Sequence, residues 1–382
     1  MNAYNPIEIE GKQIGFSNIA EHVGVLRSND GNLPHILNRI SCHKKSLGAT
    51  LAVGIARGHR ANPLVGLRIE KVYATPVLLS GLGSLVLSEM EITRLDQHYK
   101  ITSQNIQKLL SKTPRSVVFF LAGSLPLIRA LLHLRQLTLF GMIIRLVGDR
   151  LNSHAIHVLK MSKYSCKSWF WQIRDICLLY GLPHPLLLLD SPPSKHAFKQ
   201  LIKAKVIDHW ETKLRDEADT LKSLSNFHPH YMSLTKPHPL WSTVGTNPHE
   251  VTKAIQQARI LSGRYRTEKL MSHWTSNQHG YCLSLTCNKT IETVKHILIE
   301  CSVYEQTRVN LCRLWLSAED PNVLLLVMEA MSSDTDYLLQ FITDFSVIPS
   351  VIRASQRHGS TILDKLLYLT RTWRRRMKNL GR

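Results

Sequence analysis

Four side chains late in the sequence have the types and the spacing of a metal site. Cys282, Cys287, His296 and Cys301 follow the pattern C-x4-C-x8-H-x4-C. Structural zinc sites in proteins use four thiolate or imidazole ligands arranged as a tetrahedron. The whole chain has seven cysteines in 382 residues, so chance rarely places three of them beside a histidine in this way. The sequence therefore predicts a structural Zn²⁺ site, or zinc knuckle, at these four residues.

An alternative leaves the same residues without a metal, as three buried thiols and a hydrogen-bonded core histidine. Cys312 follows Cys301 by eleven residues and is predicted to be a core thiol. His279 precedes Cys282 and is a weaker candidate for a replacement ligand. Both interpretations are compatible with the pattern alone. Because a short segment has little core of its own, zinc would supply folding free energy, on the order of 10 kcal/mol in zinc-finger peptides.

The element expected to carry the second ligand pair is a helix. Thr290 is predicted to cap it, and Glu292 would lie in its positively polarised first turn. His296 and Cys301 are five residues apart, so one helix end can present both if its last turn widens. Leu298, Val303 and Tyr304 are expected to pack under the metal.

The composition indicates a polyanionic partner. The chain has 44% hydrophobic residues, enough for a core, and a net charge of +20 with a pI near 9.8. Such an excess favours RNA or DNA as the partner, and a solvated basic surface is the alternative. Residues 1–16 lack a secretion signal, and the most apolar stretch, 116–134, contains Pro126 and Arg129. No membrane segment is expected, and an intracellular location, nucleus or cytoplasm, is predicted.

The predicted fold is mainly α, with a short β remnant at the N-terminus, a helical thumb-like bundle, a helical connector and a small zinc-knuckle module. Alternation around Gly11 in "IEIEGKQI" predicts the hairpin. The expected regions are 1–30 (sheet remnant), 31–180 (helical bundle), 181–246 (Pro-rich linkers and a connector helix), 247–320 (basic helix and zinc knuckle) and 321–382 (helices with a basic tail).

Three helices have recognisable start or stop signals. Ser88 and Glu91 form a capping box, with Ile92, Leu95, Tyr99, Ile106 and Leu109 on the apolar face that follows. Asn247 and Pro248 begin a later helix that Gly263 is expected to end. In the apolar helix after Pro126, the polar side Arg129, His133 and Gln136 is predicted to face water.

Cations with neighbouring aromatic rings are the predicted nucleic-acid contacts, since lysine and arginine bind phosphates while flat rings stack on bases. These residues are Lys44, Lys45, Arg57, Arg60, Arg264, Tyr265, Arg266, Lys269, Trp274, Arg374, Arg375 and Arg376. The last three belong to the tail "RTWRRRMKNLGR", which is expected to stay in water or to lie on an anion. The alternative is that these are ordinary helix ends and a solvated terminus.

Longer stretches give the chain a resemblance to one family. "PIEIEGKQIGFSNIAEHVGVLRS", the set Pro76, Leu78, Gly81 and Leu82, the sequence "GSLP" at 123–126, and "ARILSGRYRTEKL" followed by the Cys/His pattern resemble the C-terminal part of non-LTR (LINE-type) retrotransposon reverse transcriptases. The resemblance implies the end of a palm, a thumb, a connector and a zinc knuckle. It also implies a primer-grip-like turn at His22, Val23 and Gly24.

The sequence departs from that family in three ways. Glu21 and Val23 occupy positions where lysine and leucine are commoner, and the first cysteine pair is C-x4-C in place of C-x2-C. Two adjacent aspartates, which would hold catalytic Mg²⁺, occur nowhere in the chain. No catalytic residue is therefore assigned, and Mg²⁺ is expected only if a palm in another chain supplies the missing centre.

Three functions remain open at this point. The first is a zinc-stabilised, nucleic-acid-binding segment of a reverse transcriptase that is inactive as an isolated chain. The second is a fragment of an active RNA-directed DNA polymerase whose palm lies upstream. The third is a zinc-stapled helical interaction protein without a nucleic-acid role.

Overall fold

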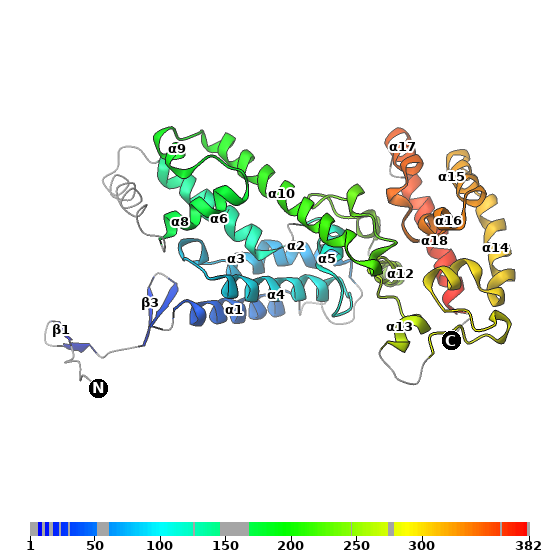
Figure 1. The fold of residues 1–382 in the computed structure, drawn as a ribbon, viewed down its shortest axis with the longest axis horizontal. Coiled ribbons are helices and arrows are strands. Elements are labelled where there is room, and N and C mark those ends of the chain that lie inside the picture. Colours follow the sequence, from blue (N-terminus) through cyan, green and yellow to red (C-terminus); the bar gives the residue numbers. More distant parts are fainter. Residues whose placement is uncertain are drawn as a thin grey trace. The chain divides into compact units, whose positions relative to one another are not determined.

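The computed structural model describes residues 7–9, 12–14, 18–22, 24–29, 31–51, 61–124, 127–145, 168–245, 247–273, 279–359 and 361–379. For 7–9, 12–14, 50–51 and 375–379 it describes the backbone alone. Within these ranges the protein is mainly helical, with short antiparallel hairpins near the N-terminus (Figure 1). The predicted fold class is thus confirmed.

Two short hairpins form the β structure. The first pairs β1 (Ile7–Ile9) with β2 (Lys12–Ile14), so that Ile7 lies opposite Ile14, in the alternating stretch where a hairpin was predicted. The second pairs β3 (Ile19–His22) with β4 (Val25–Ser28). Gly24 between these strands has φ +74°, the left-handed conformation that favours glycine in tight hairpin turns.

The described chain divides into two compact units. Unit 1 comprises residues 1–50, 69–99 and 127–206, and unit 2 comprises 51–68, 100–126 and 207–382. The helices α2 (Pro63–Ile69), α4 (Glu89–Ile106) and α10 (Lys195–Asp219) each contribute residues to both units.

Unit 1 is built from helices of very different length. Its elements are α1 (Leu33–Leu51, whose last residue belongs to unit 2), a π-helical turn (Glu70–Ala74), α3 (Thr75–Leu78), a 3-10 turn (Leu82–Ser84), α6 (Ile128–Arg145), α8 (Trp169–Leu179) and α9 (Pro185–Asp190). The predicted capping box begins α4, since the Ser88 backbone N–H donates to Glu91 Oε2 at 2.7 Å and the Glu91 N–H approaches Ser88 Oγ at 3.4 Å. Ile92 and Leu95 are buried, as the apolar face predicts.

Of the three residues predicted on the polar side of α6, Arg129 is partly exposed and pairs with Glu89 and Asp96, while the other two face α8. His133 and Gln136 are buried; His133 Nδ1 is hydrogen-bonded to Tyr180 Oη at 2.8 Å. Gln136 Nε2 donates to Gln172 Oε1 on α8 at 3.0 Å. The prediction that these two side chains face water was wrong, because α8 and the residue that follows it supply a hydrogen-bond partner to each of them away from solvent.

A polar chain joins four helical segments of unit 1: α1, α4, the π-helical turn and α3. His98 Nε2 lies 3.0 Å from His43 Nδ1, and His43 Nε2 lies 3.4 Å from Glu70 Oε1. The Thr75 hydroxyl donates to the same Glu70 oxygen at 2.6 Å. His43 and Glu70 are almost inaccessible, so each depends on this chain for its hydrogen bonds, since unpaired buried polar groups are costly.

Unit 2 contains the remaining elements. They are α5 (Arg115–Ala122), 3-10 turns at Lys222–Leu224 and Pro229–Tyr231, α11 (Pro239–Ser242), α12 (Pro248–Leu261), α13 (Glu268–Ser272), a 3-10 turn at Leu285–Cys287, a π-helical turn at His296–Glu300, a 3-10 turn at Ser302–Tyr304, α14 (Glu305–Leu316), α15 (Pro321–Ser332), α16 (Thr335–Asp344), a 3-10 turn at Phe345–Val347, α17 (Pro349–His358) and α18 (Thr361–Asn379).

The Pro- and His-rich segment before α12 is packed. Trp241 on α11 is fully buried, and its Nε1 donates to Gln107 Oε1 at 3.2 Å. Its backbone carbonyl accepts from Asn62 Nδ2 at 3.0 Å. His238 is also buried and pairs with Asp344 at 3.2 Å, so this segment belongs to the core of unit 2.

The C-terminal helices α14 to α18 share one core (Figure 1). Trp315 on α14 and Trp373 on α18 are nearly inaccessible, and their ring centroids lie 4.6 Å apart. Trp373 Nε1 donates to the Leu298 carbonyl at 3.1 Å. Leu298 is itself a member of this core, so the segment carrying the second ligand pair is attached to the bundle. None of the helices in the described ranges is long and apolar enough to cross a bilayer.

The stability of unit 1 is expected to depend on pH through His98. Burial, and then the nearby His43, lower the pKa of His98 to about 4 from 6.5. Between these values the unfolded chain binds a proton that the folded chain excludes, so stability falls as the pH falls. The stability of unit 1 should therefore be highest above about pH 6.5 and should decline as the pH falls towards about 4.

The substitution His98→Gln keeps an N–H donor for His43 but removes this titration, so the decline should become shallower. Urea unfolding at several pH values between about 7 and 4 measures it. His196→Gln, at an exposed position on α10, is the control and should keep the wild-type slope. An H98Q protein that loses stability with acid as steeply as wild type would contradict the assignment.

Candidate metal centre and basic groove

Cys282, Cys287, His296 and Cys301 converge in unit 2. One ligand atom from each lies within 4.8 Å of all the others, and all but Cys282 are buried. The predicted residues thus form a Cys₃His group that could bind a metal ion. No other such group was found among the residues that the structure describes.

The spacing of the sulfur atoms fits tetrahedral coordination. Cys301 Sγ lies 3.9 Å from Cys282 Sγ and 3.5 Å from Cys287 Sγ. Metal–sulfur bonds of 2.3 Å in a regular tetrahedron place two sulfurs about 3.8 Å apart. A disulfide would need about 2.05 Å, and the cysteines are free. The sulfurs are therefore arranged around a common point and are not paired.

The imidazole of His296 lacks hydrogen bonds in a buried position. Both Nδ1 and Nε2 are buried without a hydrogen-bond partner, and the residue is 3% exposed. Glu300 approaches it, with Oε2 3.8 Å from Nδ1, beyond hydrogen-bond distance. A metal on one ring nitrogen would satisfy it, and a carboxylate beside the ring is the usual companion of a metal-bound histidine.

The first ligand pair lies in a small knuckle loop. Tyr281 and Ile291 form an antiparallel β-bridge, and the Cys282 N–H donates to the Thr290 carbonyl at 2.8 Å. The 3-10 turn Leu285–Cys287 fills the space between the two cysteines. Asn288 and Lys289 then reverse the chain with positive φ. The four residues between the cysteines fit because this turn brings the Cys287 side chain back towards that of Cys282.

The second ligand pair lies on a widened helical turn. His296–Glu300 is π-helical, and the Cys301 N–H donates to the His296 carbonyl at 2.8 Å, five residues back. The predicted widening is thus present, but the helix start was predicted wrongly. Thr293 Oγ1 accepts from the His296 N–H at 3.0 Å, whereas the Thr290 hydroxyl donates to the Cys287 carbonyl.

The residues expected beneath the metal divide into two groups. Leu298 is buried in the C-terminal core and Tyr304 is partly buried against it. Val303 is 51% exposed, so its prediction was wrong. The helix ends at Cys301, and a 3-10 turn begins at Ser302. This change of direction moves Val303 away from the apolar side.

The three thiols have unequal proton affinities. A hydrogen bond from the Ser302 hydroxyl, 3.5 Å from the sulfur, lowers the pKa of Cys287 to about 6. Burial raises the pKa of Cys301 to about 12, and burial also raises that of Cys282. The surroundings of Cys287 thus favour its thiolate most, and a divalent cation would favour deprotonation of all three.

A basic groove of about 810 Å³ lies beside the knuckle in unit 2. Its basic and aromatic side chains are Lys222, His228, Tyr265, Lys269, His273 and Lys295. The one carboxylate on its wall, Asp336, pairs with Lys295 at 2.7 Å. Lys222 and Lys269 are exposed. Of these residues, Tyr265 and Lys269 were predicted contacts.

Lys222, His228, His273 and Lys295 were missed, because they lie on separate segments that only the folded chain brings together. Local sequence gives no signal for a surface of this kind.

Gly263 fixes the end of α12 at the edge of the groove. It has φ +63°, and its N–H donates to the Ile260 carbonyl at 3.0 Å, so the predicted helix stop is confirmed. A Cβ at this position would lie 2.0 Å from the Ser223 carbonyl oxygen. Glycine is therefore required both by the backbone conformation and by the close approach of the segment carrying Lys222.

The other predicted nucleic-acid contacts whose side chains the structure describes do not line the groove. Lys44 and Lys45 are exposed on α1 in unit 1, and Arg266 is exposed beside the partly buried Arg264 in unit 2. The Gly24 carbonyl of the primer-grip-like turn accepts from Arg39 Nη2 at 3.0 Å, and His22 is exposed. Several further residues lie outside the described side chains: Val23, Arg57, Arg60, Trp274, Arg375 and Arg376.

Arg374 does not lie in water. It is 8% exposed, and it donates from Nη2 to Gln257 Oε1 at 2.7 Å and from Nη1 to the Ile342 carbonyl. Arg371 is buried as well. The expectation of a solvated basic tail was wrong for these two residues, because α18 continues through them and packs their side chains against α12.

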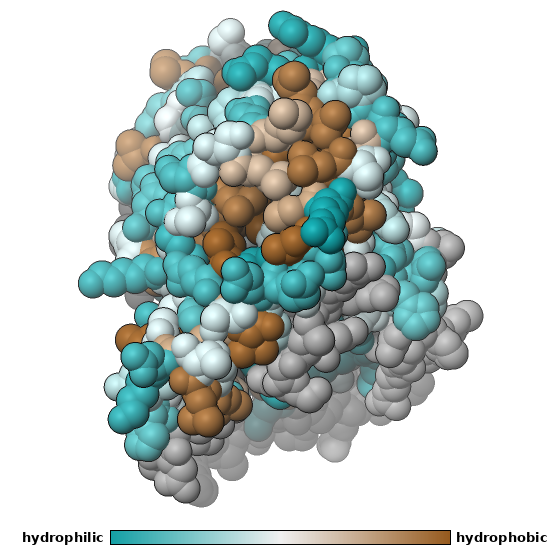
Figure 2. Space-filling model, turned by 90° about the vertical axis from the view of Figure 1, so that its right-hand side faces the viewer, coloured by the Kyte–Doolittle hydropathy of each residue, from teal (hydrophilic) through white to brown (hydrophobic). Residues whose placement is uncertain are grey.

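A different surface, on α14 and α15, is apolar. Figure 2 shows hydrophobic side chains gathered on the face where these helices lie. Leu316 is 48% exposed, Leu325 70% and Met328 51%. Apolar patches of this kind are common at protein–protein contacts.

Comparison with known proteins gives no assignment. No protein-family model, curated protein or solved structure matches the chain.

The metal centre predicts one bound divalent ion per chain. Cys287→Ser or Cys301→Ser removes a thiolate ligand, so the purified variants should hold little or no metal by mass spectrometry of the ashed protein. Cys312→Ser is the matched control, because Cys312 lies on α14 outside the Cys₃His group, and it should retain the ion. Wild-type protein that remains metal-free after refolding with excess metal would refute the site.

Gly263→Ala is expected to destabilise unit 2 by about 2 kcal/mol or more, because alanine combines a left-handed backbone with a clash at Ser223. Gly245→Ala is the control, since a Cβ there meets nothing within 4 Å, and it should change stability little. Denaturant unfolding compares the two. Equal stabilities of both variants would show that the close approach at Gly263 is absent in solution.

Proposed function

We propose that this chain is a zinc-stabilised nucleic-acid-binding protein that holds RNA or DNA in the groove beside the Cys₃His centre. The observation that carries the proposal is the placement of the groove: its wall includes Thr293, Val294 and Lys295, which directly precede the ligand His296. Metal binding would thus order one side of the groove.

Zinc is the metal that best fits the donors. Three thiolates and an imidazole in a tetrahedron are typical of structural zinc sites, whereas carboxylate and carbonyl oxygens are preferred by magnesium or calcium. All four ligand positions are occupied by protein atoms, so no open position remains for substrate. The ion would have a structural role.

The groove suits a phosphodiester chain. Lys222 and Lys269 are exposed and have no acidic neighbour on the wall other than Asp336, which pairs with Lys295. Lysines bind phosphates without reading base sequence. Tyr265, also on the wall, offers a ring on which an unpaired base can stack.

The knuckle loop offers apolar contacts to unpaired bases. Tyr281 is 43% exposed, Leu283 78% and Leu285 99%. All three lie in or beside the loop that holds Cys282 and Cys287. Unpaired bases bind to such rings and apolar side chains, whereas the stacked bases of a duplex do not offer their faces. Single-stranded RNA or DNA is therefore the favoured ligand, at roughly micromolar affinity.

The sequence resemblance gives this function a context. A C-terminal segment of a LINE-type reverse transcriptase would bind template and primer, with catalysis on a palm that carries paired aspartates. Because this chain contains no adjacent aspartates, we propose that the isolated chain binds nucleic acid and does not polymerise. An active enzyme would need a palm upstream or in a partner chain.

The apolar face of α14 and α15 favours the alternative of a zinc-stapled interaction protein. The two proposals differ in their dependence on salt. Binding of RNA through lysines releases counterions and weakens steeply as salt rises. An interaction protein would show no saturable binding to RNA even in dilute buffer.

The double substitution Lys222→Gln, Lys269→Gln should weaken binding of a labelled single-stranded RNA several-fold and reduce the slope of log affinity against log salt by about 2. Fluorescence anisotropy at increasing salt measures both quantities. The matched control is Lys203→Gln, Lys205→Gln, which removes the same charge from exposed positions on α10 and should leave the slope nearly unchanged. Loss of binding in the control alone would refute the groove.

A further inference from the structure

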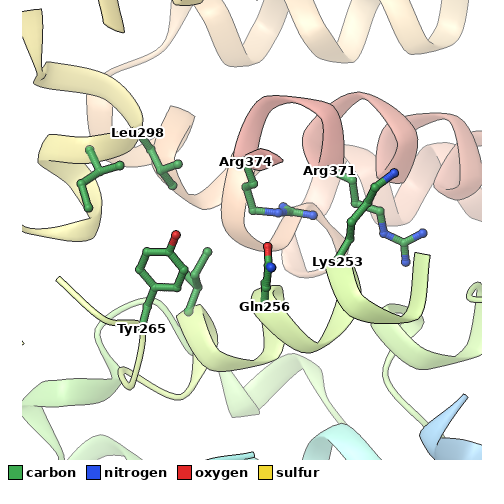
Figure 3. A pocket seen from close by; sticks show the side chains of 8 residues that line it. Lys253, Gln256, Tyr265, Leu298, Arg371 and Arg374 are labelled. Atoms are coloured by element: carbon green, nitrogen blue, oxygen red, sulfur yellow. The ribbon is translucent and has the colours of Figure 1, made fainter. Parts of the chain in front are cut away.

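A small enclosed cavity in unit 2 is lined by three cations. It lies between α12, the π-helical turn and α18, and Lys253, Arg371 and Arg374 contribute to its wall together with Gln256 and Tyr265 (Figure 3). Figure 3 shows the guanidinium groups of Arg371 and Arg374 between the two helices. The cavity lies outside the Cys₃His group.

One carboxylate, that of Glu250, is bound by two of these cations, Lys253 and Arg371. Glu250 accepts from Lys253 Nζ and lies 3.2 Å from Arg371 Nη1. Arg374 donates to neutral acceptors, the Ile342 carbonyl and Gln257 Oε1. The nearby Asp344 pairs with His238, at 3.2 Å, and with Ser346. Three cations thus surround a cavity with one carboxylate bound to two of them.

Arg371 has donors without acceptors. Its Nε and Nη2 are buried and lack a hydrogen-bond partner among the residues that the structure describes, and the residue is 6% exposed. Buried charges in proteins are almost always paired, because removing a charge from water is costly. Arg371 is paired with Glu250 through Nη1 alone, so the two buried N–H groups left at the cavity wall favour a further acceptor there.

The size of the cavity limits that ligand. The space open to the centre of a water molecule is about 10 Å³, which is room for about one atom of that size. A neutral water could accept from Arg371, whereas an anion would also be attracted by Arg374, whose hydrogen-bond acceptors are both neutral. Asp364 and Asp344 act on these two guanidinium groups from nearby. A single-atom anion such as a halide is the smallest charged ligand that could use this space and the N–H donors left without acceptors.

We propose that this cavity is a binding site for a single small anion, of which chloride is the simplest, and that the anion joins α12 to α18. It would accept from Arg371 and lie against the positive charges of Lys253 and Arg374. The consequence is that the stability of unit 2 depends on the kind of anion in solution, independently of nucleic acid.

The test replaces gluconate with chloride at constant potassium and ionic strength, using the full-length zinc-loaded protein without RNA. Gluconate is too large to enter. The melting temperature should rise by about 3 °C and then saturate, as expected for a ligand that binds only the folded state. An unchanged or a linearly drifting melting temperature would overturn the proposal.

Two variants locate the effect. Gln256→Glu places a carboxylate at the cavity wall, so the protein should melt higher in gluconate and lose its response to chloride. Gln356→Glu adds the same charge at an exposed position on α17 and should respond as wild type does. A Q256E protein that still responds fully to chloride would refute the site.

Crystals soaked in bromide give a second readout. An anomalous peak between Arg371 and Lys253 would support the proposal, and bromide peaks confined to other places would overturn it.

Discussion

The fold around the groove depends on the convergence of three sulfurs and one imidazole. Two short segments supply them, a knuckle loop closed by the Cys282–Thr290 hydrogen bond and a π-helical turn whose five-residue bond joins Cys301 to His296. The same turn inserts Leu298 into the C-terminal core, where Trp373 bonds to its carbonyl. A metal at this point would therefore connect the knuckle, one wall of the groove and the helical bundle.

The positive charges of unit 2 lie in two kinds of environment. Lys222 and Lys269 are exposed at the groove, whereas Arg371 and Arg374 are buried between helices. Burial lowers the pKa of Arg374 to about 9, which reflects the cost of keeping that charge out of water. The net charge of +20 is therefore not a measure of how many cations can reach a polyanion.

Local patterns predicted a large part of the framework. The mainly α class, the first hairpin, the Ser88–Glu91 capping box, the stop at Gly263 and the four metal-ligand candidates follow from neighbouring residue types. One error concerns a helix cap, which lies at Thr293 and not at Thr290, and the others concern burial. His133 and Gln136 were expected in water because they are polar, and Arg374 because it belongs to a cationic run. Each is buried against a helix distant in the sequence, which supplies its hydrogen bonds.

By itself the sequence determined which donors are present and the ends of α4 and α12 that carry clear signals, because caps, glycines and ligand spacing act over a few residues. Tertiary structure alone decided which charged groups share a surface. Lys222, Lys269 and Lys295 form a groove, and Lys253, Arg371 and Arg374 form a cavity. Apart from Arg371 and Arg374, which share α18, these groups are separated by many residues. Their proximity results from the packing of apolar helix faces, which local residue types do not encode.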